Sequence, residues 1–265
     1  MLRGKFGLIG GVIAAVCVAV MVIIAANVFG SAGDRQTSEN RAELGLVTSL
    51  PIYWNEGDPF TQLADGDVPL PWVRAAIERK YNIRPIDVLA GKDDPAGESA
   101  GDLQDLERLV IIQPRGLSPV DNVALDDWVR AGGRLFYAID PMLSGEYDVP
   151  IGDPRHPTIT ALVPPVLARW GLELFYEDSQ SEAPFIVQWD DLPLVAQLPG
   201  RLSLHPQSEL AQDSTCVIAA EGLIARCSVG EGQVTIMADA ALFEPREGND
   251  AAEATIAALL EKAVS

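Results

Sequence analysis

The strongest constraint on the fold lies between Leu109 and Pro141, where two apolar runs flank one capped helix. The runs Leu109–Gln113 and Arg134–Pro141 show little alternation of apolar and polar residues, which is typical of strands buried on both faces of a parallel sheet. Between them, Ser118 and Asp121 form a weak capping-box pattern, and Gly132 lies in a Gly-Gly helix stop. The sequence therefore predicts a βαβ unit with a right-handed crossover.

Similar patterns on either side of this unit predict an α/β domain with a parallel sheet and helices on both faces. An internal proline, Pro85, favours an edge position for the second strand. Short β-like pieces within residues 178–230 indicate a small antiparallel extension. The other elements expected are strands at Leu44–Leu50, Ile83–Leu89, Leu172–Tyr176, Phe185–Trp189, Leu202–Leu204 and Gln233–Asp239, and helices from Pro71, at Thr160–Trp170 (kinked or restarted at Pro164-Pro165) and at Asp250–Val264.

The amino-terminal region contains an uncharged apolar run from Phe6 to Val28. At helical rise this run spans roughly 34 Å, enough to cross a hydrocarbon core of about 30 Å. Because Arg3 and Lys5 precede it, we expect a cytoplasmic tip (1–5), an inner-membrane anchor (6–29), a flexible tether (30–43) and a periplasmic domain (44–265). The alternative is a signal peptide cleaved near residues 30–32.

The charge balance of the chain excludes one class of partner. Asp and Glu number 38 against 19 Lys and Arg, which gives a formal net charge of −19. Such a surface repels nucleic acid and anionic lipid and favours solubility. The expected partners are therefore the membrane around the anchor and other proteins, with no nucleic acid.

The chain has three cysteines, of which Cys17 lies in the apolar run. The other two, Cys216 and Cys227, flank a Glu221-Gly222 turn signal. Pairing residue 220 with residue 223 in a hairpin places these two cysteines opposite each other, which favours a disulfide in an oxidising compartment. The alternative is a pair of reduced, buried thiols.

The usual catalytic signatures are missing. Each of the two histidines, His156 and His205, precedes a proline and has no cysteine or second histidine nearby, so we expect no metal site. The sequence contains no nucleophile elbow or phosphate-binding glycine loop, and we expect no cofactor. Asp140 and Asp239 each end an apolar run, so the two carboxylates could pair for acid–base work; alternatively, each caps a following turn.

The segment Ile52–Phe60 is the expected binding loop, because it follows the first strand at the edge where α/β sheets bind ligands. Tyr53 and Trp54 are residue types enriched at interface hot spots. The polar residues that would surround them are Asn55, Glu56 and Asp58. Alternatively, the two aromatic side chains fold back over the sheet edge.

Three stretches, taken together, resemble a family of auxiliary proteins of ABC-type transport systems, including the gliding-motility-type auxiliary proteins. They are LVIIQPRGLSPVDNVALDDWVRAGGRLFYAIDPM, ARWGLEL and GEGQVTIMADAALFEP. The resemblance covers about residues 44–265. It implies a flavodoxin-like core related to class I glutamine amidotransferases, a membrane anchor and association with permease or ATPase subunits. It carries over no catalytic residue, because Asp140-Pro141 stands near the expected elbow and no cysteine lies there.

Two functions are therefore compared below. The first is a non-enzymatic, membrane-anchored module that binds a partner of an ABC-type transport system. The second is a hydrolase or transferase that uses Asp140 and Asp239 on an envelope glycan.

Overall fold

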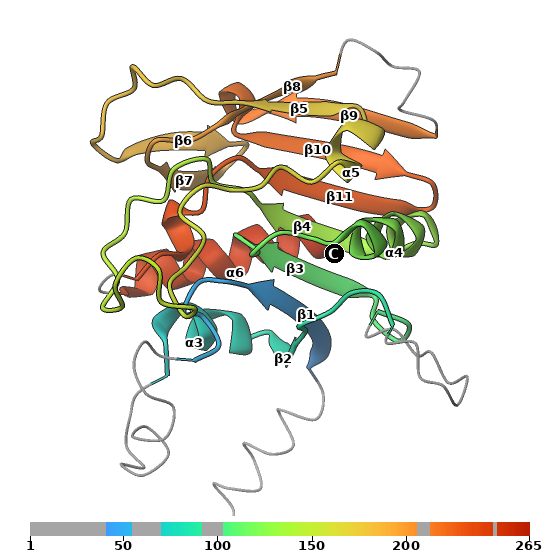
Figure 1. Cartoon of the computed structure of the whole chain (residues 1–265), viewed down its shortest axis with the longest axis horizontal. Coiled ribbons are helices and arrows are strands. Elements are labelled where there is room, and N and C mark those ends of the chain that lie inside the picture. The colour runs from blue at the N-terminus through green and yellow to red at the C-terminus, as the bar shows by residue number, and fades with distance from the viewer. Residues whose placement is uncertain (1–40, 55–69, 92–102, 206–212, 246–247) are drawn as a thin grey trace, which may run out of the picture. The chain divides into compact units, whose positions relative to one another are not determined.

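A seven-stranded sheet lies at the centre of the unit formed by Glu43–Ser265 (Figure 1). The computed structural model describes residues 41–54, 70–91, 103–205, 213–245 and 248–265. Across the sheet, the strands are β2 (Tyr81–Pro85), β1 (Ala42–Thr48), β3 (Arg108–Ile112), β4 (Arg134–Ala138), β11 (Gly232–Met237), β10 (Ile224–Val229) and β9 (Ser214–Ala219). The pairs β1–β3, β3–β4 and β4–β11 are parallel, whereas β10 is antiparallel to both of its neighbours.

Helices pack on both faces of this sheet (Figure 1). On one face lie α3 (Trp72–Glu78) and α6 (Asp250–Val264), and on the other lie α4 (Pro119–Arg130) and α5 (Val166–Arg169). Side chains alternate along each parallel strand, so Val110 contributes to the first core and Leu109 to the second. Both cores exclude water, which explains the nearly continuous apolar runs of the sequence. The α/β class with a mostly parallel sheet is confirmed.

The predicted βαβ unit is confirmed as β3, α4 and β4. The Ser118 side chain accepts a hydrogen bond from the backbone N–H of Asp121, and the Asp121 carboxylate accepts one from the backbone N–H of Ser118, both at 3.2 Å. The same carboxylate accepts the N–H groups of Leu89 and Ala90, at 3.0 and 2.9 Å. The capping box therefore also fastens the chain after β2 to the start of α4.

Two predicted elements were wrong in part. The helix expected over Thr160–Trp170, with a kink or restart at Pro164-Pro165, forms only after these prolines, as α5. Prolines lack the N–H that a helix interior needs and disfavour helical geometry in the residue before them. The second strand lies at Tyr81–Pro85 rather than Ile83–Leu89. It is an edge strand, as Pro85 predicted.

The carboxyl-terminal half adds antiparallel structure, as expected. The hairpin β9–β10 extends the main sheet. Two further antiparallel pairs stand apart from that sheet. One is β5 (Leu172–Phe175) with β8 (Arg201–Leu204), and the other is the hairpin of β6 (Phe185–Trp189) and β7 (Leu192–Ala196). Sequence analysis missed β7, which contains Pro193. Short 3-10 turns complete the unit at η2 (Ala220–Gly222) and η3 (Ala241–Phe243).

The predicted anchor at residues 6–29 and most of the predicted tether lie outside the described residues. Among the residues that are described, no helix combines the length and apolar character needed to cross a bilayer.

Candidate functional site

A row of buried polar residues follows the carboxyl ends of the four parallel strands. Ser49 follows β1, Gln113 follows β3, Asp140 follows β4 and Asp239 follows β11. A buried polar group is costly unless it is hydrogen-bonded. Each of these four side chains has such a partner. The hydrogen bonds of these four side chains therefore hold the loops at this edge of the sheet in place.

Gln113 connects three of these loops. Its backbone adopts a positive φ of 43°, which is uncommon for a residue other than glycine. Its side-chain oxygen accepts the N–H of Asp140 at 2.9 Å, and its side-chain nitrogen donates to the carbonyls of Asp140 and Thr158 at 3.0 and 2.7 Å. The hydroxyl of Ser49 donates to the Gln113 carbonyl at 2.5 Å. These bonds hold the strained turn in place and direct the chain towards Arg115.

Asp140 and Asp239 lie at neighbouring strand ends, and both side chains are fully buried. Asp140 accepts the N–H groups of Met142 and Ala240, at 2.8 and 2.9 Å. Asp239 accepts the N–H groups of Gln197 and Ala241, at 2.8 and 2.5 Å. Each carboxylate therefore holds one residue of its own turn and one residue of a neighbouring loop.

Burial is the main cause of the raised pKa values of Asp140 and Asp239. It raises the pKa of Asp140 to about 7, although two backbone N–H groups oppose the shift. The pKa of Asp239 is raised well above its usual value, first by burial and then by the charge of Asp140. The pair has the mutual influence expected of an acid–base couple, but neither side chain is exposed to a substrate.

Sequence analysis missed a third buried carboxylate, Glu244. It accepts the backbone N–H groups of Ser144 and Gly145, at 2.9 and 2.8 Å, and hydroxyl hydrogens from Ser144 and Tyr147. Its charge contributes to the raised pKa of Asp140. Its partners lie about 100 positions away in the sequence, so no local pattern indicated this role.

A pocket of about 280 Å³ opens at the same edge, between the ends of β1, β2 and β3. β2 and β3 lie on opposite sides of β1 in the sheet. From β1 the chain passes through α3 to β2 on one side of β1, and it then continues on the other side with β3, α4 and β4. The chain order therefore reverses between β1 and β3, and open α/β sheets bind ligands at such a reversal. The residues that line the pocket are Leu46, Thr48–Pro51, Tyr53, Trp54, Pro85–Asp87, Arg115, Val149, Arg155 and Pro157.

Tyr53 and Trp54 form the aromatic wall of this pocket. Their rings meet edge to face, with centroids 5.0 Å apart. Arg74 of α3 lies 4.1 Å above the Tyr53 ring and donates to the Tyr53 carbonyl at 2.8 Å, while Glu78 accepts from Arg74 at 2.7 Å. Tyr53 is partly buried against the core, whereas Trp54 is 62% exposed. Helix α3 therefore holds one aromatic residue in place and leaves the next one in solvent.

The remaining predicted members of this loop, Asn55, Glu56 and Asp58, lie outside the described residues. The charged side chains at the pocket are instead Asp87, Arg115 and Arg155, all exposed. Sequence analysis did not single out Arg115, which follows the predicted strand Leu109–Gln113 by two positions. The turn that carries Arg115 depends on contacts of Gln113 with distant loops, so its role had no local signature.

Arg155 is fixed by a neighbouring acid. Its Nε and Nη2 atoms donate to the two carboxylate oxygens of Asp153, at 3.1 and 2.9 Å. Hydrogen bonds from the Arg155 side chain and backbone lower the pKa of Asp153 to about 2. The segment that covers the pocket therefore presents its arginine in a defined orientation.

His156 packs within its own loop region. The Nδ1 atom of His156 lies 2.9 Å from the Pro157 carbonyl oxygen, and its ring packs against Tyr147. Within the described ranges, no group of three or more His, Cys, Asp or Glu residues is arranged to hold a metal ion.

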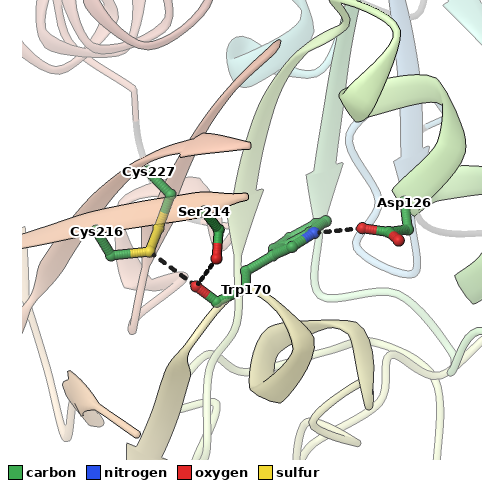
Figure 2. The surroundings of a disulfide bond; sticks show 5 residues. All are labelled: Asp126, Trp170, Ser214, Cys216 and Cys227. Carbon is green, nitrogen blue, oxygen red and sulfur yellow. Dashed lines mark hydrogen bonds between the residues drawn. A yellow bond between two sulfur atoms is a disulfide. The ribbon is translucent and has the colours of Figure 1, made fainter. Parts of the chain in front are cut away.

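Cys216 and Cys227 form a disulfide across the β9–β10 hairpin (Figure 2). They occupy the opposed positions that the turn signal predicted. The Cys216 sulfur lies 3.2 Å from the carbonyl oxygen of Trp170, to which Ser214 donates its hydroxyl hydrogen at 3.1 Å. A disulfide sulfur carries no hydrogen, so only the serine makes a hydrogen bond here. The bridge therefore packs on the residue that ends α5.

From the same residue, a polar connection leads to α4 (Figure 2). The Trp170 indole nitrogen donates to Asp126 at 2.8 Å, and Asp126 also accepts from Arg130 and Arg169, at 3.0 and 2.5 Å. Burial alone would raise the pKa of Asp126, but these bonds and the two positive charges lower it. This cluster joins α4, α5 and the hairpin and has no exposed carboxylate, so we assign it to the fold.

Comparison with known proteins places this α/β unit in a family. Residues 43–180, more than half of the chain, match the family described as an ABC-type uncharacterized transport system. The protein therefore belongs to this family, as the sequence resemblance predicted. The family's name suggests an auxiliary component of an ABC-type transport system. A search of curated proteins gives no match.

Solved structures match this chain at low sequence identity and with TM-scores below 0.5. An exo-β-1,4-mannosidase from an Opitutaceae bacterium is 14% identical with a TM-score of 0.43, covering 84% of this chain and 33% of the other. A β-galactosidase from Bacillus circulans is 13% identical with a TM-score of 0.45, covering 84% and 31%. A ThuA-like protein from Parabacteroides merdae is 9% identical with a TM-score of 0.38, covering 85% and 91%. The chain spans about a third of the length of the two glycosidases.

Proposed function

We propose that this protein is a non-enzymatic, membrane-anchored module that binds a permease subunit of an ABC-type transport system through the surface around Trp54. Membership of the family supports the type of partner. The observation that carries the proposed surface is an exposed tryptophan on a fixed base, at the point of the sheet where the chain order reverses. Because Arg74 and Tyr53 already hold that base, little conformational entropy is lost on binding.

The proposed location is the periplasmic side of the inner membrane. The apolar run Phe6–Val28 after Arg3 and Lys5 favours an anchor with an exported domain. The Cys216–Cys227 disulfide supports the same location, because structural disulfides persist in oxidising compartments and are rare in the cytoplasm.

The positions of the acidic residues favour binding over catalysis. A carboxylate pair that acts on a glycan must contact the glycosidic bond. Asp140 and Asp239 are fully buried, and each carboxylate oxygen accepts a backbone N–H group. We therefore propose that the two residues hold the loops around the pocket and that hydrolysis is not the function.

Trp54→Ala tests the proposed surface. The full-length chain, co-expressed with the permease and ATPase subunits of an ABC-type transport system from its own organism, is expected to co-purify with them from detergent-solubilised membranes. Removing an exposed hot-spot tryptophan should weaken this association by about 2 kcal/mol, or roughly thirtyfold, because the aromatic contact is lost. The domain's thermal midpoint should change little, since exposed side chains contribute little to stability.

Phe175→Ala is the matched control, because Phe175 is also exposed (53%) but lies on β5, outside the pocket. It should leave the association unchanged. Unaltered binding of the Trp54→Ala variant would contradict the proposed surface. A loss of about 3–5 kcal/mol in its unfolding free energy would instead identify Trp54 as a packing residue.

A further inference from the structure

Arg115 is the charged residue at the pocket with the clearest capacity for a ligand. Its guanidinium is exposed, and among the described residues no acidic side chain lies within ion-pair distance of it. The turn that carries it begins at Gln113, whose side chain is held by hydrogen bonds to Asp140, and reaches Gly116, which has a φ of +111°. A planar guanidinium on a fixed turn suits two-point recognition of a carboxylate or phosphate.

The described lining of the pocket lacks the excess of acidic residues that the whole chain has. The protein carries a formal net charge of −19, yet two arginines, Arg115 and Arg155, converge on this pocket from different loops. Asp153 partly neutralises Arg155 and fixes its orientation. Among the described residues that line the pocket, Asp87 is the one acid. An anion entering here would therefore meet donors from two directions.

The rest of the lining is apolar and suits a ring or chain rather than a free ion. Leu50, Pro51 and Ile86 form the inner part, and Tyr53 and Trp54 form the outer wall. A largely apolar cavity with a few converging polar groups is the usual form of a small-molecule site. A volume of about 280 Å³ admits one ring with an attached acidic group.

We propose that this pocket binds an anionic group, a phosphate or a carboxylate, attached to an apolar ring or chain that packs against Tyr53 and Trp54. Arg115 binds the anion, and Arg155 adds a second set of donors. The inference rests on the proposed function in one respect, the assignment of binding to this edge of the sheet. It adds the chemistry of what is bound there.

The test is a calorimetric titration of the full-length chain, in a non-ionic detergent, with phenyl phosphate and with benzoate. Phenol and inorganic phosphate serve as the neutral and the ring-free comparisons. At least one aromatic anion is expected to bind at a single saturable site and more tightly than both comparison ligands. Binding of phenol equal to that of the aromatic anions would overturn the role of charge, and tightest binding of inorganic phosphate would overturn the role of the apolar wall.

Single substitutions test which side chain binds the anion. Arg115→Gln should weaken binding at least about tenfold, because a hydrogen-bonded ion pair is lost. Arg115→Lys should have an intermediate effect, since lysine keeps the charge but not the forked geometry. Arg226→Gln is the matched control, because Arg226 is exposed on β10 and does not line the pocket. Equal weakening by Arg226→Gln and Arg115→Gln would show nonspecific attraction and overturn the proposal.

Competition distinguishes two sources of the anion. Displacement of phenyl phosphate by monomeric dihexanoylphosphatidylglycerol, but not by the phosphatidylcholine analogue, would identify a lipid headgroup. Binding of phenyl phosphate without displacement by either lipid would identify a soluble ligand. A chain that co-purifies with the permease but binds no aromatic anion would overturn this inference and leave the proposed function in place. The converse result would overturn the proposed function alone.

Discussion

At the scale of single residues, Asp140 combines a raised pKa with complete burial. Both of its oxygens accept backbone N–H groups, so the charged form is partly compensated, yet burial still raises its pKa to about 7. The nearby Glu244 carboxylate adds to this effect. Asp140 is therefore a source of pH dependence in the stability of the loops at the site.

The sign of that dependence follows from linkage. In the unfolded chain Asp140 titrates near 3.8, whereas in the folded protein it titrates near 7, so folding is favoured when it is protonated. This contribution is fully present below pH 4 and is lost as the pH rises through 7. The difference in unfolding free energy between wild type and Asp140→Asn should therefore fall from pH 4 to pH 8, by up to roughly 4 kcal/mol.

Chemical denaturation at several pH values measures this difference. Asp191→Asn is the control, because the Asp191 side chain is 96% exposed, and its effect on unfolding should be small at every pH. A difference between wild type and Asp140→Asn that stays constant or rises with pH would show that Asp140 is charged in the folded protein.

Residues differ in how far sequence alone could assign them. Trp54 could be placed at the binding edge because it belongs to the loop that follows the first strand. Asp140 and Asp239 could be placed at neighbouring strand ends, but a pattern cannot tell a carboxylate that caps backbone from one that meets substrate. Arg115 and Glu244 depend on contacts between distant loops, which have no local signature.

At the scale of elements, β11 and α4 approach so closely that only glycine fits between them. A Cβ atom on Gly232, the first residue of β11, would lie 2.0 Å from the Val129 carbonyl oxygen and 2.5 Å from that of Gly133. These are backbone atoms of the α4 end, which cannot rotate away. The same region is tied by the N–H of Glu231, which donates to the Arg130 carbonyl at 3.0 Å.

Gly232→Ala should therefore lower the unfolding free energy by several kcal/mol, because the helix must move away from the sheet. Gly132→Ala is the control: nothing lies within 4 Å of its added Cβ atom, but its φ is +112°. It should lose only about 1–2 kcal/mol, from backbone strain. Denaturant melts of both variants measure the difference, and an equal or larger loss for Gly132→Ala would contradict the steric argument.

Elements with strong local signals were predictable, and those decided by tertiary context were not. The βαβ unit was clear because its strands are buried on both faces and its helix has a capping box. The helical pattern expected from Thr160 began too early, whereas the restart expected at Pro164-Pro165 is where α5 begins. Strand β7 was missed because Pro193 argues against a strand interior, although β7 belongs to a two-stranded pair.

At the scale of the whole molecule, the compartment of the domain determines whether its cysteines are oxidised or reduced. The chain contains three cysteines, and two of them form a disulfide in the structure. If the domain is exported, Cys216 and Cys227 meet an oxidising compartment, whereas a domain kept in the cytoplasm would have reduced thiols. Counting free thiols therefore reports on topology.

The expected count is one thiol per chain, that of Cys17, when the protein is purified from membranes with an alkylating agent present and unfolded without reductant. A cleaved signal peptide would remove Cys17 and give none. Deleting residues 1–29 should keep the domain in the cytoplasm and give two free thiols, those of Cys216 and Cys227. The deletion variant should also be less stable than the bridged protein, by about 3 kcal/mol at most, because the bridge closes a short loop. Three free thiols in the full-length chain would contradict both export and the disulfide, since a domain on the periplasmic side has no means of keeping that pair reduced.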